Sequence, residues 1–221
     1  MTPPVRIFIV EDHPIFRMGM TELINRETDM TVCGDADNVP DAREGIADQK
    51  PDLVVVDLSL KQSNGMDLVR EICEEYEDTA CLVLTMHDES LHADRCIKAG
   101  ARGYIMKEEA SKSVISAIRE IMAGNLYVSR SVMSRMLDRL HKKPDPAELS
   151  PISSLTDREM EIFQYIGEGC ATGEIAKQLN ISVKTIGTYR ERIKEKLGIR
   201  QNGKLVRHAV IWVETGRTAA G

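Results

Sequence analysis

The chain of 221 residues contains no apolar run near the roughly 20 residues that a helix needs to cross a bilayer. Its N-terminus shows no signal peptide, and internal repeats are absent. Cysteine is scarce, and the five cysteines lack C-x-x-C spacing, which argues against a disulfide framework or a cysteine metal site. We therefore expect a cytoplasmic protein with buried, reduced thiols and no membrane partner.

The net charge of −6 hides a difference between the two parts of the chain. Residues 1–150 carry 18 basic against 27 acidic side chains, a net of −9, whereas residues 151–221 carry 11 against 8, a net of +3. Basic residues of the second part crowd into one stretch: Lys184, Arg190, Arg192, Lys194, Lys196, Arg200, Lys204 and Arg207. This stretch indicates either a polyanionic partner or merely a solvated helix face.

Between residue 5 and about residue 123, short apolar runs alternate five times with amphipathic segments. This pattern is typical of a parallel sheet with helices on both faces, so we predict an α/β, doubly wound, flavodoxin-like domain. The predicted strands are Val5–Val10, Met30–Gly34, Leu53–Asp57, Cys81–Thr85 and Gly103–Met106. A last helix is predicted over Ser111–Ala123, with a core-facing stripe of Val114, Ile118, Ile121 and Met122.

A joint between two domains is predicted next. A helix is expected over Ser129–His141, but residues 142–154 are rich in proline and polar side chains that cannot continue a core. We predict a first domain at residues 1–125, a linker with a helix at 126–152, and a small all-α domain at 153–221. The second domain opens with a capping box of Thr156 and Glu159.

Charged side chains collect at the ends of the predicted strands. Asp57 ends the third strand, the pair Glu11–Asp12 follows the first, and Lys107 follows the fifth. Because ligands gather at the carboxyl ends of parallel strands, these side chains are expected to converge. Three carboxylates repel one another unless a cation such as Mg²⁺, which prefers oxygen ligands and bridges to phosphate, neutralises them. The sequence therefore predicts a site for Mg²⁺ and a phosphoryl group.

Each residue of this site has a predicted role. Asp57 is the expected nucleophile that accepts the phosphoryl group, since such transfers depend mainly on positioning and charge stabilisation. Asp12 and the backbone carbonyl of Ser59 would hold Mg²⁺ beside Asp57, with Glu11 acting through water. Lys107 would pair with a phosphoryl oxygen.

Two further residues predict a switch. Thr85, at the end of the fourth strand, would donate its hydroxyl to the new phosphoryl group and draw the following loop inward. Tyr104 would then change rotamer to fill the space. Taken singly, an aspartate at a strand end is usually a helix cap and a threonine there only a strand former. The order and spacing of the whole set favour the functional interpretation.

These residues also carry a resemblance to a known family. They are Glu11–Asp12, Asp57–Leu60, Asn64–Gly65, Thr85, Ala99–Tyr104 and Lys107. With them, residues 5–123 resemble the receiver domain of bacterial two-component response regulators. The resemblance implies that a sensor histidine kinase phosphorylates Asp57 and that the domain catalyses only its own phosphorylation and dephosphorylation. Lys61 stands where the family most often has proline. Proline stiffens a loop, so its absence is expected to affect the rigidity of this loop and the lifetime of the phosphoryl group.

The segment Thr172–Glu191 predicts a helix, a tight turn and a second helix, with Ser182 as the N-cap of the second. The packed face is expected to hold Ile175, Ala176, Leu179, Ile186, Ile193 and Leu197. The outward face is expected to hold Lys184, Gly187, Thr188, Glu191 and Arg192. Such a face fits the major groove of double-stranded DNA, where a recognition helix meets base edges and basic groups contact phosphates.

Further motifs resemble the NarL/FixJ family with its LuxR-type helix-turn-helix: Leu155–Thr156, Arg158–Glu159, Ile181–Ile186 and Lys196–Gly198. The residues expected to contact DNA are Lys184, Thr185, Thr188, Glu191 and Arg192. Gly187 departs from the family, which usually has a side chain there, and glycine costs about 1 kcal/mol of helix propensity. Glu191 either accepts from a cytosine amine or pairs with a basic neighbour.

The sequence as a whole predicts a transcription regulator controlled by phosphorylation of Asp57. The resemblance implies a homodimer on paired half-sites and RNA polymerase as a further partner. The stripe from Leu205 to Trp212 is a candidate dimer surface, and closing a small core is the equal alternative. Two other classes remain open: a phosphatase or phosphotransferase with an aspartyl intermediate, and a constitutive DNA- or protein-binding regulator whose first domain only dimerises.

Overall fold

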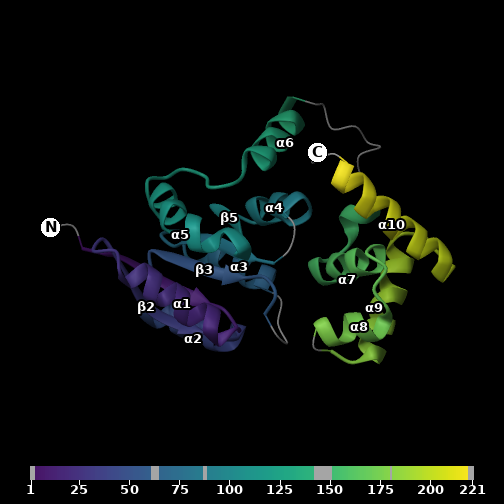
Figure 1. Ribbon diagram of the computed structural model, residues 1–221, viewed down its shortest axis with the longest axis horizontal. Helices are drawn as coiled ribbons and strands as arrows, with labels where there is room; N and C mark the ends of the chain where they lie inside the picture. The colour runs from purple at the N-terminus through teal and green to yellow at the C-terminus, as the bar shows by residue number, and fades with distance from the viewer. Residues whose placement is uncertain (1–2, 61–64, 87–88, 142–150, 180, 219–221) are drawn as a thin grey trace. The chain divides into compact units, whose positions relative to one another are not determined.

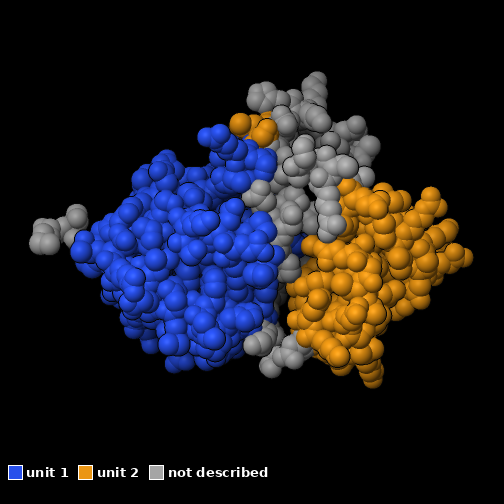
Figure 2. Space-filling view, viewed as in Figure 1, with its two compact units in different colours: residues 1–133 blue, residues 134–221 orange. Residues whose placement is uncertain are grey.

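The computed structural model describes residues 3–60, 65–86, 89–141, 151–179 and 181–218. The chain forms two compact units, residues 1–133 and residues 134–221 (Figure 2). Lys61, Asn64 and residues 142–150 of the predicted linker lie outside the described residues. The domain limits at residues 125 and 153 stay predictions. Across the described part of the chain, no helix combines the length and the apolar character that a membrane crossing requires.

The first unit is built on a five-stranded parallel sheet in the order β2-β1-β3-β4-β5, which confirms the predicted fold class. Figure 1 shows this sheet with the helices of the first unit around it. The strands are β1 (Val5–Val10), β2 (Met30–Ala36), β3 (Leu53–Asp57), β4 (Ala80–Thr85) and β5 (Gly103–Met106). Three of them have the predicted bounds, while β2 and β4 extend slightly further. Every residue of β3 is buried, as expected of a central strand covered on both faces.

Helices follow the strands: α1 (Pro14–Asn25), α2 (Val39–Gln49), α3 (Gly65–Glu75), α4 (Glu89–Lys98) and α5 (Lys107–Met122). Helices α1 and α5 pack on one face of the sheet, where side chains such as Ile24 and Ile118 join Ile9 and Val55 in one apolar core. On the other face α2 approaches so closely that a Cβ at Gly45 would touch the ring of Phe8. Because side chains alternate along a strand, the apolar runs of the strands supply buried side chains to both faces of the sheet.

Helix α5 differs from its prediction at both ends. It begins at Lys107 instead of Ser111, and it ends at Met122, after which Gly124 adopts φ 88°. Of the predicted stripe, Val114, Ile118 and Ile121 are buried, but Met122 is 40% exposed, so its assignment to the core is wrong. The buried face runs through positions 110, 114, 117, 118 and 121, and residue 122 lies past its edge in the last turn.

The chain after α5 covers the outer edge of β5. The amide of Tyr127 donates to the carbonyl of Arg102, and the amide of Tyr104 donates to the carbonyl of Tyr127, both at 2.9 Å. Tyr127 thereby forms a parallel bridge opposite Gly103, and its side chain packs on the core beneath α5. A Cβ at Gly103 would meet the Tyr127 carbonyl oxygen at 3.2 Å, so glycine permits this close approach.

Helix α6 (Arg130–His141) begins one residue after its predicted start and crosses the division between the units. Ser129 precedes it, and its hydroxyl accepts from the amide of Val132 at 3.2 Å. This contact leaves Ser129 outside the helix as a capping residue.

The second unit is all helical over its described residues. It contains the 3₁₀ helix η2 (Pro151–Ser154), α7 (Asp157–Gly167), α8 (Thr172–Gln178), α9 (Val183–Lys196) and α10 (Asn202–Thr218). The predicted capping box is present: Thr156 accepts from the amide of Glu159, and the Glu159 carboxylate accepts from the amide of Thr156. Phe163 lies at the centre of the core, 5.6 Å from the ring of Trp212.

All five cysteines are free thiols, as predicted, but only Cys81 and Cys96 are buried. Cys33, Cys73 and Cys170 are half-buried, so the expectation of buried thiols is met in part.

Candidate functional site

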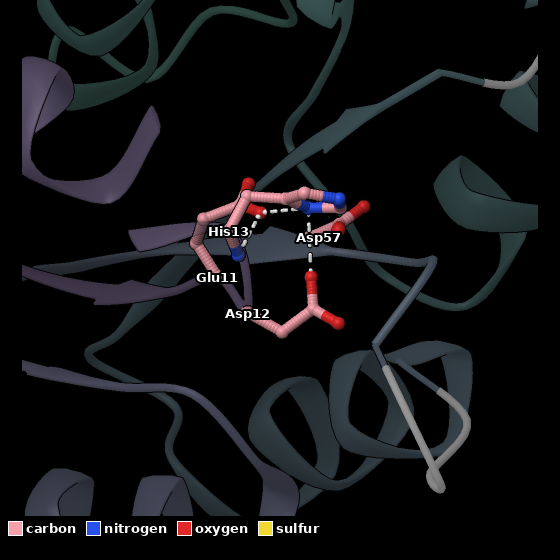
Figure 3. Close-up of side chains that lie close together, drawn as sticks. All are labelled: Glu11, Asp12, His13 and Asp57. Carbon is pink, nitrogen blue, oxygen red and sulfur yellow. Dashed lines mark hydrogen bonds and ion pairs between the residues drawn. The ribbon is translucent and has the colours of Figure 1, made fainter. Parts of the chain in front are cut away.

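Asp57, Glu11, Asp12 and Lys107 converge at the carboxyl edge of the sheet, as the sequence predicts. Figure 3 shows the three carboxylates of this group together with His13. Asp57 is the last residue of β3, the acidic pair follows β1, and Lys107 opens α5. Their exposed fractions are only 1% for Asp57, 2% for Glu11, 7% for Asp12 and 8% for Lys107. Buried charges are costly unless they are paired, so this concentration needs internal compensation.

Lys107 supplies that compensation. Its Nζ lies 2.8 Å from Oδ2 of Asp57 and 2.7 Å from Oε2 of Glu11. It also lies 5.0 Å from the centre of the Phe16 ring, whose face attracts a cation. Because α5 starts at Lys107 and not a turn later, the side chain reaches both carboxylates from a fixed backbone position.

Burial raises the pKa of Asp57, the positive charge of Lys107 lowers it, and the negative charge of Glu11 raises it; the net effect is a raised pKa. The Ser59 amide also donates to Oδ1 of Asp57 at 2.9 Å, which favours the carboxylate. For Lys107, burial lowers the pKa, but Asp57 and Glu11 together raise it above its ordinary value. Lys107 therefore stays a cation and offsets part of the cost of an ionised Asp57.

The carboxylates fit a divalent cation by their chemistry and spacing. Glu11, Asp12, His13 and Asp57 each offer a ligand atom, and these atoms all lie within 4.8 Å of one another. Three of the four donors are carboxylate oxygens, the type that hard cations prefer. For Ser59 the structure gives a contact of the amide with Asp57, and the metal-binding role of its carbonyl stays a prediction.

The sequence prediction missed His13 at this site. Its Nδ1 lies 2.8 Å from Oδ1 of Asp12 and 3.0 Å from Oε1 of Glu11 (Figure 3). Arg17 was missed as well: one guanidinium nitrogen donates to the Glu11 carbonyl, and Nε lies 2.8 Å from Asp35. The sequence signal for His13 was its place directly after the acidic pair, and for Arg17 its place inside the helix that follows.

The two predicted switch residues are both buried, Thr85 at 0% and Tyr104 at 3% exposure. Thr85 ends β4 opposite Met106, and Tyr104 lies opposite Val83 on the same strand pair. The contact of a phosphoryl group with Thr85 and the rotamer change of Tyr104 stay predictions. The backbone amide of Tyr104 donates to the carbonyl of Tyr127 at the outer edge of β5, a contact that the sequence did not indicate.

In the second unit, α8 and α9 form the predicted helix-turn-helix. Ile175, Ala176, Leu179, Ile186 and Ile193 are buried as expected, and Leu197 is half-buried against the same core. The hydroxyl of Ser182 accepts from the amide of Thr185 at 3.0 Å, which confirms Ser182 as the N-cap of α9.

The predicted DNA-contacting residues of α9 differ in exposure. Lys184, Thr188, Glu191 and Arg192 are exposed, while Thr185 is half-buried. The Thr185 hydroxyl lies 2.7 Å from that of Ser182, and the Thr188 hydroxyl donates to the Lys184 carbonyl. Glu191 pairs with Lys194 at 2.8 Å, the second of its two predicted roles. DNA contacts at these positions stay predictions.

Gly187 lies inside α9, and a Cβ added there would have nothing within 4 Å. No close approach within the described residues explains the glycine, so its departure from the family has no packing cause.

Comparison with known proteins decides the family. Residues 7–119 match the family described as response regulator receiver domain, and residues 153–209 match the family described as bacterial regulatory proteins, luxR family. The chain belongs to the two-component response regulators. This membership confirms the predicted fold class and DNA-binding regulator class, and it removes the enzyme alternative.

One relative of the regulator is the oxygen regulatory protein NreC of Staphylococcus epidermidis, which is 30% identical over 211 residues. The match covers 93% of this chain and 97% of that protein. A LuxR-family response regulator from Aurantimonas sp. is 31% identical, with a TM-score of 0.57 over 63% of this chain and 99% of the other.

Structures of the response regulator RcsB share the fold at lower identity. RcsB from Salmonella enterica serovar Typhimurium, bound to a promoter with a phosphomimetic, is 22% identical, with a TM-score of 0.59 over 94% of this chain and 98% of the other. A structure of two RcsB dimers bound to two parallel DNAs is 24% identical, with a TM-score of 0.56 over 92% and 96%.

Proposed function

We propose that a sensor histidine kinase phosphorylates Asp57 of this regulator and that the modification controls DNA binding by α9. The observation that carries the proposal is the position of Asp57, buried at the sheet edge with Lys107 on one carboxylate oxygen at 2.8 Å. A buried structural aspartate has no need of two further carboxylates beside it. A phosphoryl acceptor needs such neighbouring carboxylates, because they can bind a cation that offsets the negative charge of the phosphoryl donor.

The proposed reaction is transfer of a phosphoryl group from a phosphohistidine to Asp57. A carboxylate oxygen of Asp57 attacks phosphorus, the new P–O bond replaces the P–N bond, and the leaving imidazole takes up a proton. Lys107, already at Oδ2 of Asp57, would pair with a phosphoryl oxygen. Mg²⁺, when bound, would supply charge neutralisation between donor and acceptor. Asp12, Asp57 and the Ser59 carbonyl would hold it, with Glu11 acting through water.

In the phosphorylated state Thr85 would donate its hydroxyl to the phosphoryl group, and Tyr104 would change rotamer. Both side chains are buried beside the sheet edge, so a shift of one changes the space open to the other. This differential contact would separate the two states of the first unit.

We further propose that α9 enters the major groove of double-stranded DNA and that Lys184, Thr185, Thr188, Glu191 and Arg192 face it. The exposure of four of these residues supports the proposal. The structure of two RcsB dimers on DNA supports a DNA-bound homodimer for this regulator. Paired half-sites and RNA polymerase as a further partner are proposed from the family resemblance. On α10, Val206 and Ile211 are 39% and 47% exposed, whereas Leu205 and Ala209 are buried, so only part of that stripe is open to a second copy.

The experiment compares DNA affinity with and without a small acyl phosphate plus Mg²⁺, for the wild type and Asp57→Ala. The DNA is a fragment that the wild type selects from a random-sequence pool. We expect tighter binding and a larger dimer fraction only for the phosphorylated wild type. Asp48→Ala, at an exposed aspartate of α2, is the matched control and should respond as the wild type does.

The second candidate function is a constitutive DNA-binding regulator whose first unit only dimerises. It predicts equal DNA affinity and equal oligomeric state with and without phosphorylation. Demonstrated phosphorylation of Asp57 without either change would establish it and exclude phosphorylation control.

A further inference from the structure

We propose that Cys73 and Cys81 of the first unit form a redox pair, in which peroxide oxidises Cys73 and Cys81 then closes a reversible disulfide with it. The two thiols are hydrogen-bonded to each other in the structure. Cys81 lies at the amino end of β4, whereas Asp57 and Thr85 lie at the carboxyl ends of their strands. The pair is therefore separate from the site of the proposed function.

Three elements bring cysteines together on one face of the sheet. Leu82 and Leu84 of β4 belong to the core beneath α1 and α5, so the alternation of side chains places Cys81 on the opposite face. There Cys73, from the last turn of α3, and Cys96, from α4, lie close enough for their charges to act on Cys81. Cys81 and Cys96 are 0% and 1% exposed, whereas Cys73 is half-buried. Of these three thiols, Cys73 is the one that a reagent from solvent can reach.

Gly100, in the turn between α4 and β5, limits the space around Cys73. A Cβ on Gly100 would lie 2.6 Å from Cβ and 3.0 Å from Sγ of Cys73. With φ at 104°, Gly100 also has a backbone conformation that other residues rarely adopt. The backbone of Gly100 thus packs directly on one side of Cys73 and leaves the thiol in contact with Cys81.

The surroundings of Cys73 favour its thiolate. The hydrogen bond with Cys81 lowers the pKa of Cys73, burial opposes this effect, and the positive charge of Arg102 adds to it; the net result is a lowered pKa. Burial instead raises the pKa of Cys33 and of Cys170, the other two half-buried thiols. Because the thiolate is the form that reacts with peroxide, Cys73 is expected to oxidise before them.

The proposed reaction has two steps, with hydrogen peroxide as the oxidant. The Cys73 thiolate attacks one peroxide oxygen, so that an S–O bond forms, the O–O bond breaks, and the leaving hydroxide takes up the thiol proton as water. The Cys81 sulfur then attacks the sulfenic sulfur of Cys73. An S–S bond forms, the S–O bond breaks, and the hydroxide leaves with the Cys81 proton as a second water. The two thiols are oxidised, the peroxide is reduced, and a thiol reductant restores the pair by exchange.

The experiment treats the full chain with hydrogen peroxide and counts its free thiols after unfolding. We expect the count to fall from five to three, since two thiols enter the bond, and to return to five with dithiothreitol. Trypsin leaves Cys73 and Cys81 together on residues 71–95, because no lysine or arginine lies between them, and places Cys96 on the next peptide. The proposed bond therefore lowers the mass of peptide 71–95 by two hydrogens, and further cleavage after Glu77 yields two peptides linked by the bond.

Two variants separate the two steps. Cys73→Ser should keep its four remaining thiols in peroxide, whereas Cys81→Ala should leave Cys73 as a sulfenic acid that dimedone traps. Cys170→Ser is the matched control, because Cys170 is a half-buried thiol of the second unit, and it should still lose two thiols.

The peptide masses of the wild type decide the inference even where a variant fails to fold. A bond from Cys73 to Cys96 would join two tryptic peptides, and a bond between chains would double the mass of the protein; either result would overturn the pairing. Five thiols that persist in peroxide, or losses spread over all the cysteines, would show that Cys73 and Cys81 only pack against each other.

Discussion

At the scale of single residues, Gly65 shows how closely the chain passes over Asp57, the proposed phosphoryl acceptor. A Cβ on Gly65 would fall on the carbonyl oxygen of Asp57 and lie 2.7 Å from the Cα of Leu58. Both neighbours are backbone, so neither can move aside as a flexible side chain can. The glycine of the Asn64–Gly65 motif therefore has a steric reason in the structure.

We predict that Gly65→Ala destabilises the first unit and slows phosphorylation of Asp57. Overpacking of this kind costs about 1–3 kcal/mol. Urea unfolding followed by circular dichroism measures the first effect, and phosphorylation by an acyl phosphate measures the second. Gly19→Ala is the control, since a Cβ at Gly19 in α1 meets nothing within 4 Å. If the two variants behave alike, the close passage over Asp57 has no energetic consequence.

At the same scale, Gly187 offers the opposite expectation. Alanine in the middle of a helix is more stable than glycine by about 0.5–1 kcal/mol when it meets no obstacle. We therefore predict that Gly187→Ala stabilises the second unit by about that amount. The only tryptophan of the chain, Trp212, packs on Phe163 and reports unfolding of this unit by its fluorescence. A loss of stability would contradict the open space around residue 187.

At the scale of elements, Glu159 ties α7 to α9. Lys196 of α9 lies 2.6 Å from the Glu159 carboxylate, which is 3% exposed and also accepts from the amide of Thr156. Burial raises the pKa of Glu159, but the hydrogen bonds from Lys196 and Thr156 outweigh it and hold the pKa below its ordinary value of 4.5. A carboxyl group of this kind stabilises the fold above its unfolded pKa, and the stabilisation is lost as pH falls through the lower folded pKa.

We predict that Glu159→Gln lowers the free energy of unfolding of the second unit at pH 7 by about 1.5 kcal/mol, the value of a hydrogen bond to a charged group. The difference from the wild type should begin to shrink as pH falls below 4.5, the ordinary pKa, and should be lost as pH falls through the lower pKa of the folded Glu159 carboxyl group. Urea unfolding followed by Trp212 fluorescence at pH 7 and in acid measures both values. A difference that is constant with pH would show that the charge of Glu159 does not contribute.

The elements also show how far the sequence predicts the structure. Three of five strands have the predicted bounds, because alternating and continuous apolar runs identify them directly. Strand β2 continues to Ala36 because Asp35 and Ala36 pair with Ile9 and Val10. The sequence around Asp35 is polar and gives no apolar pattern from which this pairing could be predicted. The start of helix α5 at Lys107 was not predicted, because its N-cap residue, Met106, makes no side-chain capping bond and no capping residue marks it in the sequence.

The sequence predicted which charged residues meet at the candidate site, but not the contacts of the residues around them. Positions at strand ends sufficed to bring Asp57, Glu11, Asp12 and Lys107 together, since parallel strands share a carboxyl edge. The contacts of His13 were not predictable, because they depend on a rotamer at the N-cap of α1. The bridge of Tyr127 was likewise missed, since one isolated pair of hydrogen bonds leaves no periodic pattern.

At the scale of the whole molecule, we expect the basic stretch of the second unit to set the salt dependence of DNA binding. Arg192 is exposed, and its guanidinium lies 5.9 Å from the centre of the Tyr189 ring. If it contacts a DNA phosphate, Arg192→Glu should weaken binding at every sequence and lower the salt dependence by about 0.9 per lost contact.

Arg26→Glu is the matched control, because Arg26 is an exposed arginine of the first unit and the charge change is the same. DNA affinity of both variants is measured over a series of salt concentrations. Equal slopes for Arg192→Glu and the wild type would remove Arg192 from the DNA-contacting set.

The bridge at Tyr127 has a consequence for any fragment of the regulator. A fragment that ends at residue 125, the predicted domain limit, would lose the partners of the Arg102 carbonyl and the Tyr104 amide. The outer edge of β5 would then be an open strand edge, a template on which other chains can pair and aggregate. A fragment that continues to Met133 retains Tyr127, and light scattering should find it monomeric where the shorter one self-associates.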